Sequence, residues 1–156
     1  MRVLTLLALL LSTVAVSLGQ APPIGMKGKV ILVLLKQQRL YAVEDGVILY
    51  DFHCCTGRKG RETPTGKTVV QLKKRHNWAL PELGGGPIPF TLRIYMYDPK
   101  MGRVRRINIH ASNDVKLKPD SSGCVRLATV SAKKLFGWAE EKTTTVIVMD
   151  GPPPKK

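Results

Sequence analysis

Acidic, aromatic and sulfur-containing side chains are scarce in this 156-residue chain. It has 11 Asp and Glu against 25 Lys and Arg, and its formal net charge is +14. Such an excess attracts polyanions and acidic polymers, although it does not select a fold. Aromatic residues make up 6% of the chain, and the basic clusters 73–75 and 103–106 contain none. Because proteins that bind single-stranded nucleic acid stack its bases on aromatic side chains, we expect no nucleic-acid partner.

Only three cysteines are present, and the histidines show no metal-ligand spacing to a cysteine pair, so we expect no metal and no cofactor. Cys54 and Cys55 are neighbours. Neighbours on a strand point to opposite faces, which disfavours a disulfide between them. Two interpretations of this pair stay open. Either one of them is a small buried core residue, or one forms a reversible disulfide with Cys124.

Long apolar segments are also rare, and residues 3–16 form the longest. This run follows Arg2 and precedes the small residues Ser17 and Gly19, as in a cleavable secretory signal over residues 1–19. It is shorter than the roughly 20 apolar residues that span a bilayer, and more than one cleavage bond fits. We therefore expect an exported protein of the periplasm, cell wall or extracellular space, peripheral to the membrane at most.

The remaining chain is long enough for one domain with a hydrophobic core. Residues 20–28 are rich in proline and glycine and predict a linker. Residues 29–149 alternate short apolar segments with polar turns and predict one folded domain. Residues 150–156 have no core-forming side chains and predict a flexible tail. The sequence contains no internal repeats.

Apolar segments rich in Val, Ile and Leu predict a mainly β domain. The expected strands lie at 29–35, 40–43, 47–52, 67–72, 91–97, 104–110 and 143–149. Apolar side chains then recur at helical spacing, at Ala132, Leu135, Phe136 and Ala139. They predict one amphipathic helix, capped by Thr129 or Ser131. The glycine- and proline-rich segment 84–90 fits either a lid or wall of a substrate groove or an ordinary surface connection.

The most informative segment for chemistry is Ser121-Ser122-Gly123-Cys124-Val125-Arg126. A cysteine at neutral pH is mostly protonated and needs a nearby base before it acts as a nucleophile. His110, at the end of a predicted strand, supplies that base. Gly123 adopts backbone angles that other residues avoid, so the N–H groups of Ser122, Gly123 and Cys124 converge beside the sulfur as an oxyanion site. The pattern predicts Cys124 as the nucleophile of acyl transfer and His110 as its general base.

Two neighbours have supporting roles in this prediction. Ser121 tightens the turn through its hydroxyl group. Arg126 shares a face with the nucleophile because it lies two residues beyond it on the chain. There it either stabilises the turn by hydrogen bonds to carbonyl groups, which we favour, or holds a substrate carboxylate.

These residues resemble the signature of the L,D-transpeptidase catalytic domain, or YkuD, family, in which a strand ends in His and Ser-His-Gly-Cys-[Ile/Val]-Arg follows. Ser122 stands where the family has its second His, and Ala111 stands where the family usually has Gly. The opening half resembles the family independently. It contains Gln38-Arg39-Leu40-Tyr41, Gly46, Thr56-Gly57 and Thr63-Pro64-Thr65-Gly66 in the family's order. The resemblance covers roughly residues 29–149.

The resemblance implies a β-sandwich-like fold with one main helix after the cysteine. It also implies a cysteine-dependent L,D-transpeptidase that acts on peptidoglycan stem peptides. In such an enzyme a thioester forms on Cys124 and an amine acceptor resolves it, and a backbone carbonyl, here that of Ala111, orients His110. An L,D-carboxypeptidase or amidase that uses water is an alternative, as is a non-catalytic basic wall-binding module. The diamino acid, the acceptor and the oligomeric state stay open.

Overall fold

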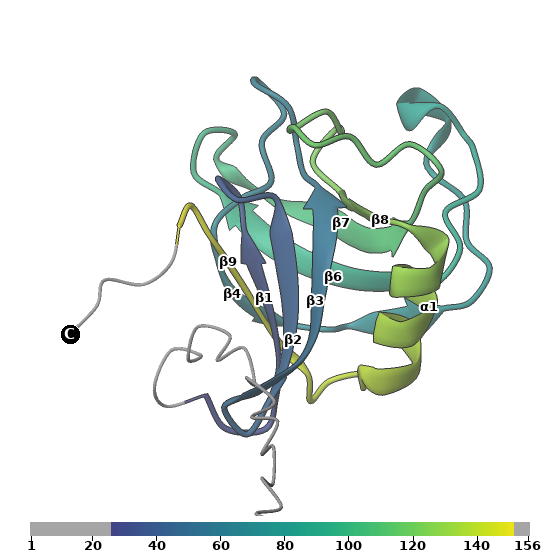
Figure 1. The fold of residues 1–156 in the computed structure, drawn as a ribbon. Coiled ribbons are helices and arrows are strands. Elements are labelled where there is room, and N and C mark those ends of the chain that lie inside the picture. Colours follow the sequence, from purple (N-terminus) through teal and green to yellow (C-terminus); the bar gives the residue numbers. More distant parts are fainter. Residues whose placement is uncertain (1–25, 152–156) are drawn as a thin grey trace, which may run out of the picture.

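The computed structural model describes residues 26–151 (Figure 1). The predicted signal 1–19 lies outside the described residues, as do residues 20–25 of the predicted linker and residues 152–156 of the predicted tail. Within residues 26–151, no helix has the length and apolar character needed to cross a membrane.

The described part of the chain forms one curled β-sheet with one α-helix. Its strands are β1 (Lys29–Leu34), β2 (Arg39–Glu44), β3 (Val47–Cys55), β4 (Gly66–Val69), β5 (Leu72–Lys74), β6 (Thr91–Asp98), β7 (Arg103–Ala111), β8 (Val125–Leu127) and β9 (Thr145–Met149). They pair in the order β4-β9-β1-β2-β3-β8-β7-β6-β5. The helices are α1 (Thr129–Trp138) and a short 3-10 helix, η1 (Pro81–Leu83).

The sheet curls because β3 belongs to both of its halves. β3 pairs with β2 along most of its length and with β8 at Cys54 and Cys55. β4 and β6, which belong to opposite halves, contact each other across the fold (Figure 1). The side chains between the halves, such as those of Ile31 and Ile94, are fully buried. The sequence-based prediction of a mainly β domain with one helix is confirmed.

One predicted strand, 67–72, proves to be two. The Val70 N–H donates to Thr144 just before β9, whereas the Gln71 N–H donates to Arg93 of β6. The chain therefore crosses from one half of the sheet to the other at residues 70–71, and β4 and β5 lie at opposite ends of the strand order. The apolar run continues through this crossover because Val70 is fully buried there. Apolar character alone does not reveal which neighbour each half of the run pairs with.

Helix α1 packs on β7 and β6 through the buried side chains of Ala132 and Leu135. The predicted N-cap is wrong, because Ala128 occupies that position without a side-chain hydrogen bond. β8 ends at Leu127, one residue earlier. The chain thus passes directly from strand to helix, and Thr129 is already the first helical residue.

Strand β7 determines where the site lies. Its first four residues, from Arg103 to Arg106, are mostly exposed, whereas Ile107 to Ala111 are buried. β7 runs antiparallel to β6 and parallel to β8. Because β8 begins at Val125, directly after Cys124, the pairing of β7 with β8 fixes the cysteine turn against the buried end of β7.

Candidate active site

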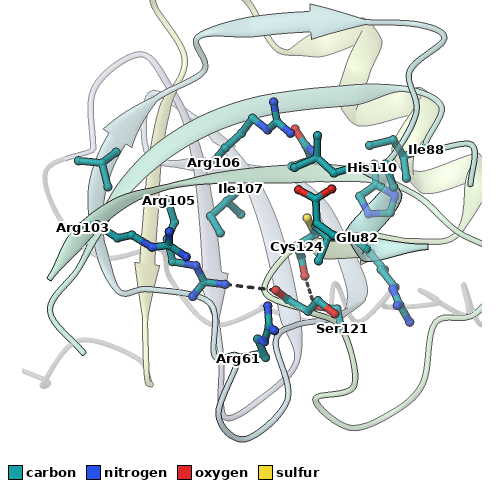
Figure 2. Close-up of a pocket in the computed structure, with 17 residues that line it drawn as sticks. Arg61, Glu82, Ile88, Arg103, Arg105, Arg106, Ile107, His110, Ser121 and Cys124 are labelled. Atoms are coloured by element: carbon teal, nitrogen blue, oxygen red, sulfur yellow. Dashed lines mark hydrogen bonds between the residues drawn. The ribbon is translucent and has the colours of Figure 1, made fainter. Parts of the chain in front are cut away.

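A cavity of about 390 Å³ lies beside β7, and Cys124 and His110 both line it (Figure 2). One wall is formed by residues of β7. A second wall comes from the segment between β5 and β6, through Ala79, Leu80, Glu82, Leu83 and Ile88. Ile88 belongs to the glycine- and proline-rich segment 84–90. The structure therefore favours the interpretation of that segment as part of a groove wall.

The register of β7 and β8 explains why the cysteine and the histidine meet. Ile109 lies opposite Val125 in this parallel pair. One residue earlier, Cys124 falls beside Asn108. Alternate residues of a strand share a face, so Asn108 and His110 both point to the cavity side of β7. His110 is then the diagonal neighbour of Cys124, and both side chains line the same cavity.

The His110 ring is buried, and its Nδ1 lies 2.8 Å from the carbonyl oxygen of Ala111. A carbonyl oxygen only accepts hydrogen bonds, so the ring proton is on Nδ1 and the lone pair is on Nε2. Burial lowers the pKa of His110 below its usual value, and the positive charge of Arg126 acts in the same direction. The Ala111 carbonyl opposes them. The imidazole is therefore neutral at pH 7 and can accept a proton.

Burial also raises the pKa of the Cys124 thiol above its usual value. The backbone of Asn108 opposes this shift by hydrogen bonding to the sulfur, as do the charges of Arg105, Arg126 and Arg106. Burial has the largest effect, so the resting site holds a neutral thiol and a neutral imidazole. A thiolate then has to be generated by proton transfer to His110 when a substrate is attacked.

The cysteine turn is held by the hydroxyl group of Ser121. It donates to the Cys124 carbonyl at 2.5 Å and accepts the Gly123 N–H at 3.1 Å. Gly123 has a φ of +114°, and a Cβ there would lie 2.2 Å from the Arg105 guanidinium. Glycine is thus required for both conformation and space. Because Ser121 already engages the Gly123 N–H, the remaining donors of the predicted oxyanion site are those of Ser122 and Cys124.

Arg105 also positions this turn, although it belongs to none of the sequence motifs that predict the site. Its guanidinium donates to the Asp98 carboxylate at 2.7 Å and to the Glu62 carbonyl at 2.7 Å. It also donates to the Ser122 carbonyl at 3.2 Å (Figure 2). The Arg105 and Asp98 side chains are only 10% and 8% exposed. Hydrogen bonding from Arg105 is the main cause that lowers the pKa of Asp98. The signal was present, because alternation places Arg105 on the buried face of β7 with Ile107.

Threonines and glycines from the N-terminal half of the domain also hold the cysteine turn by hydrogen bonds. Thr63 donates to the Gly123 carbonyl at 2.8 Å and accepts the Gly57 N–H at 3.0 Å. The carbonyl of Thr56 accepts the N–H of Ser121 at 3.0 Å. Gln38 in turn holds Thr56 through its side-chain amide, with Oε1 accepting the Thr56 N–H at 2.9 Å. Two signatures far apart in the sequence therefore build one hydrogen-bonded support for Cys124.

Arg126 and Ser122 both have charged partners. The Arg126 guanidinium lines the cavity and lies 3.1 Å from Asp114 and 3.8 Å from Asp120. Its polar contacts are these ion pairs, rather than the carbonyl hydrogen bonds that the sequence suggested. The Ser122 hydroxyl accepts a hydrogen bond from Arg58 at 3.0 Å. The position at which the family has its second His thus lies next to a guanidinium.

All three cysteines are free thiols. Cys54 belongs to the hydrophobic core, where burial raises its pKa to about 12. Cys55 is also buried, and its sulfur lies 3.3 Å from the Lys118 carbonyl. Neither residue lines the cavity that contains Cys124. The structure therefore favours the core interpretation of this pair over the disulfide with Cys124.

Residues 28–148 match the family described as the L,D-transpeptidase catalytic domain. The chain matches no curated protein. Among solved structures, it is similar to an L,D-transpeptidase from Xylanimonas cellulosilytica, with 26% identity over 82% of this chain and 63% of that one and a TM-score of 0.64. An L,D-transpeptidase from Stackebrandtia nassauensis gives 23% identity, 90% and 64% coverage, and a TM-score of 0.65.

A third similar structure is L,D-transpeptidase 3 from Mycobacterium tuberculosis in complex with a faropenem-derived adduct. It has 18% identity, covers 78% of this chain and 60% of that one, and has a TM-score of 0.63. The present chain spans less than two thirds of each of these solved chains. At 23% and 18% identity, the second and third structures establish the shared fold alone.

Proposed function

Because the chain belongs to the L,D-transpeptidase catalytic domain family, we propose that it is a transpeptidase-type enzyme, an exported L,D-transpeptidase. In this proposal Cys124 is the nucleophile and peptidoglycan stem peptides are the substrates. One observation carries the proposal. Cys124 and His110 line the same cavity, and the Ala111 carbonyl holds the His110 ring with Nδ1 protonated, which makes Nε2 the base.

The first half of the proposed reaction transfers an acyl group to the enzyme. Nε2 of His110 takes the proton of the Cys124 thiol while the sulfur attacks the carbonyl carbon of the donor peptide. The N–H groups of Ser122 and Cys124 stabilise the tetrahedral oxyanion. The C–N bond to the terminal D-alanine then breaks, and imidazolium 110 gives its proton to the departing amine. A thioester remains on Cys124.

The second half reverses the roles. An acceptor amine attacks the thioester carbonyl and loses its proton to His110. The C–S bond breaks, and the sulfur leaves and recovers that proton. The product is a new amide that crosslinks or attaches the stem peptide. Water in place of the amine gives hydrolysis to a shorter peptide, so the outcome depends on which acceptor reaches the thioester first.

Mass spectrometry of the protein after incubation with faropenem tests the nucleophile, since a solved relative contains a faropenem-derived adduct. We expect one adduct, located on the tryptic peptide of Cys124 and absent from a Cys124→Ser variant. Cys54 and Cys55 are internal controls because both are buried. An adduct on either of them, or none at all, contradicts the proposal.

Incubation with tetrapeptide muropeptides then distinguishes the reactions. Crosslinked dimers indicate transfer, whereas tripeptides alone indicate hydrolysis. A His110→Gln variant provides the control for the base, because it keeps a polar side chain of similar length without an acceptor of comparable basicity. We expect it to acylate at least about 100-fold more slowly, the range that general bases contribute.

A further inference from the structure

The cavity that contains Cys124 is strongly basic. Five arginines line it, Arg61, Arg103, Arg105, Arg106 and Arg126, with Glu82 as the acidic lining residue. Arg105 and Arg126 already have carboxylate partners in Asp98 and Asp114. Within residues 26–151, Arg61, Arg103 and Arg106 form no ion pair. Their charges are therefore available to an anion that enters the cavity.

The three unpaired arginines lie on two sides of the reacting sulfur. Arg103 and Arg106 belong to the exposed start of β7, and Arg61 belongs to the loop between β3 and β4 (Figure 2). Arg106 shares a strand face with Asn108 and His110. It lies two residues from Asn108 on the side opposite His110, about 7 Å along the strand. A peptide laid along β7 with its reacting carbonyl at Cys124 thus places a neighbouring group beside Arg106, and Arg61 and Arg103 line the same cavity.

We propose that Arg61, Arg103 and Arg106 form an anion-binding wall that selects donor peptides whose non-reacting carboxyl groups are free, and that discriminates against the corresponding carboxamides. This inference rests on the proposed function, because it names the substrate class of that site. A guanidinium binds a carboxylate better than it binds a carboxamide. A guanidinium has five N–H donors and no acceptor, so it pairs with both oxygens of a carboxylate. A carboxamide offers one acceptor oxygen, no charge, and an NH2 group that the guanidinium cannot satisfy.

Binding to a Cys124→Ala variant tests the wall without any need for turnover. Two synthetic tetrapeptides serve as probes, identical except that their non-reacting carboxyl groups are free in one and amidated in the other. We expect calorimetry to show about tenfold tighter binding of the free form at low salt, from charge-assisted hydrogen bonds that the amide lacks. This ratio should fall at about 0.5 M NaCl because the arginines are exposed and their charges are screened.

Single Arg61→Gln, Arg103→Gln and Arg106→Gln substitutions in that background locate the effect. We expect at least two of them to weaken binding of the free peptide roughly three- to tenfold and to leave the amidated peptide unchanged. Lys134→Gln on α1 is the matched control, since it removes one exposed positive charge that does not line the cavity. It should change neither affinity. Glu82→Gln should have the opposite sign and should not weaken binding of the free peptide.

Equal affinities for the two peptides overturn the inference, as do substitutions that weaken both peptides equally. The result is separable from the proposed function. If wild-type protein is acylated by the donor peptide but the Cys124→Ala variant binds both forms alike, only the anion-binding wall is refuted. If wild-type protein is never acylated, the proposed function fails first and the assignment of a donor peptide fails with it.

Discussion

Replacement of Arg105 tests how the nucleophile turn is held. Arg105→Ala leaves the Asp98 carboxylate without its cation and leaves the Glu62 and Ser122 carbonyls without a donor. Breaking a buried ion pair in this way costs about 3–5 kcal/mol. Asp98 keeps the backbone N–H groups of Lys100 and Met101 as partners. We therefore expect the low end, a loss of about 3 kcal/mol in the free energy of unfolding measured with urea.

A second substitution separates stability from positioning. Asp98→Asn in the Arg105→Ala background removes the uncompensated charge but keeps an oxygen for the Lys100 and Met101 N–H groups. We expect it to recover roughly half of the lost stability, because most of the cost of a broken buried pair comes from the charge left behind. It cannot restore the hydrogen bond to the Ser122 carbonyl, so the cysteine turn keeps only its contacts with Ser121 and Thr63.

Acylation by faropenem measures the consequence for the turn. Displacing a reacting group by about 1 Å can cost up to about 100-fold in rate, so we expect the double variant to acylate at least tenfold more slowly per folded molecule. The pH dependence of Cys124 alkylation by iodoacetamide should also move to higher pH. The sign follows because the Arg105 charge lowers the pKa of this thiol and its loss lets the pKa rise.

If the double variant regains stability and also acylates at the wild-type rate, Arg105 is only a partner of Asp98 and does not position the cysteine turn. Arg105→Lys provides the intermediate case, since it keeps the charge but cannot form three hydrogen bonds in fixed directions. It should preserve most of the thiol titration while losing part of the acylation rate.

Three further predictions concern the same turn and its base. Gly123→Ala should lower the acylation rate at least about tenfold, measured with faropenem, because alanine is strained at a φ of +114° and its Cβ would lie 2.2 Å from the Arg105 guanidinium. A wild-type rate contradicts the requirement for glycine at this position. Thr63→Val should lower the free energy of unfolding in urea by about 1–2 kcal/mol, because the Gly123 carbonyl and the Gly57 N–H lose their partner. An unchanged midpoint and slope would show that these hydrogen bonds do not stabilise the fold. The acid limb of the pH profile of kcat/KM should lie below pH 6.5, because burial lowers the pKa of His110. The imidazole stays neutral, and able to act as a base, until the pH falls through this lowered pKa. An acid limb above pH 6.5 contradicts the prediction.

The sequence predicts the catalytic residues of the site better than the residues that hold the cysteine turn in place. Cys124 and His110 carry functional groups that few other residues offer, and alternation along β7 is enough to point His110 to one face. The anchor of the turn depends instead on a contact between Arg105 and Ser122, and no local pattern encodes that contact. Only the position of Arg105 on the buried face of β7 hints at it. A charged residue among Ile107 and Ile109 requires a buried partner.

The fold shows the same division between local and non-local information. The periodicity of Ala132 and Leu135 predicts the helix because it depends on neighbours along the chain. The split of 67–72 into β4 and β5 depends on two partners, Thr144 and Arg93, that lie far away in the sequence. The three-residue strand β8 is set by its pairing with β7 and β3 rather than by its own composition.

The basic cavity and the neutral resting thiol lead to a common conclusion about activation. Arg106 lowers the pKa of Cys124, yet it is also one of the arginines that we assign to a substrate carboxylate. A bound carboxylate would cancel much of its field at the sulfur. Arg105 and Arg126, the other two cations that act on the thiol, are already paired with Asp98 and Asp114. The positive electrostatic field that favours a Cys124 thiolate is therefore weakest in the enzyme–substrate complex, where the nucleophile is needed. Deprotonation of Cys124 consequently has to depend on His110, with proton transfer coupled to attack on the carbonyl carbon.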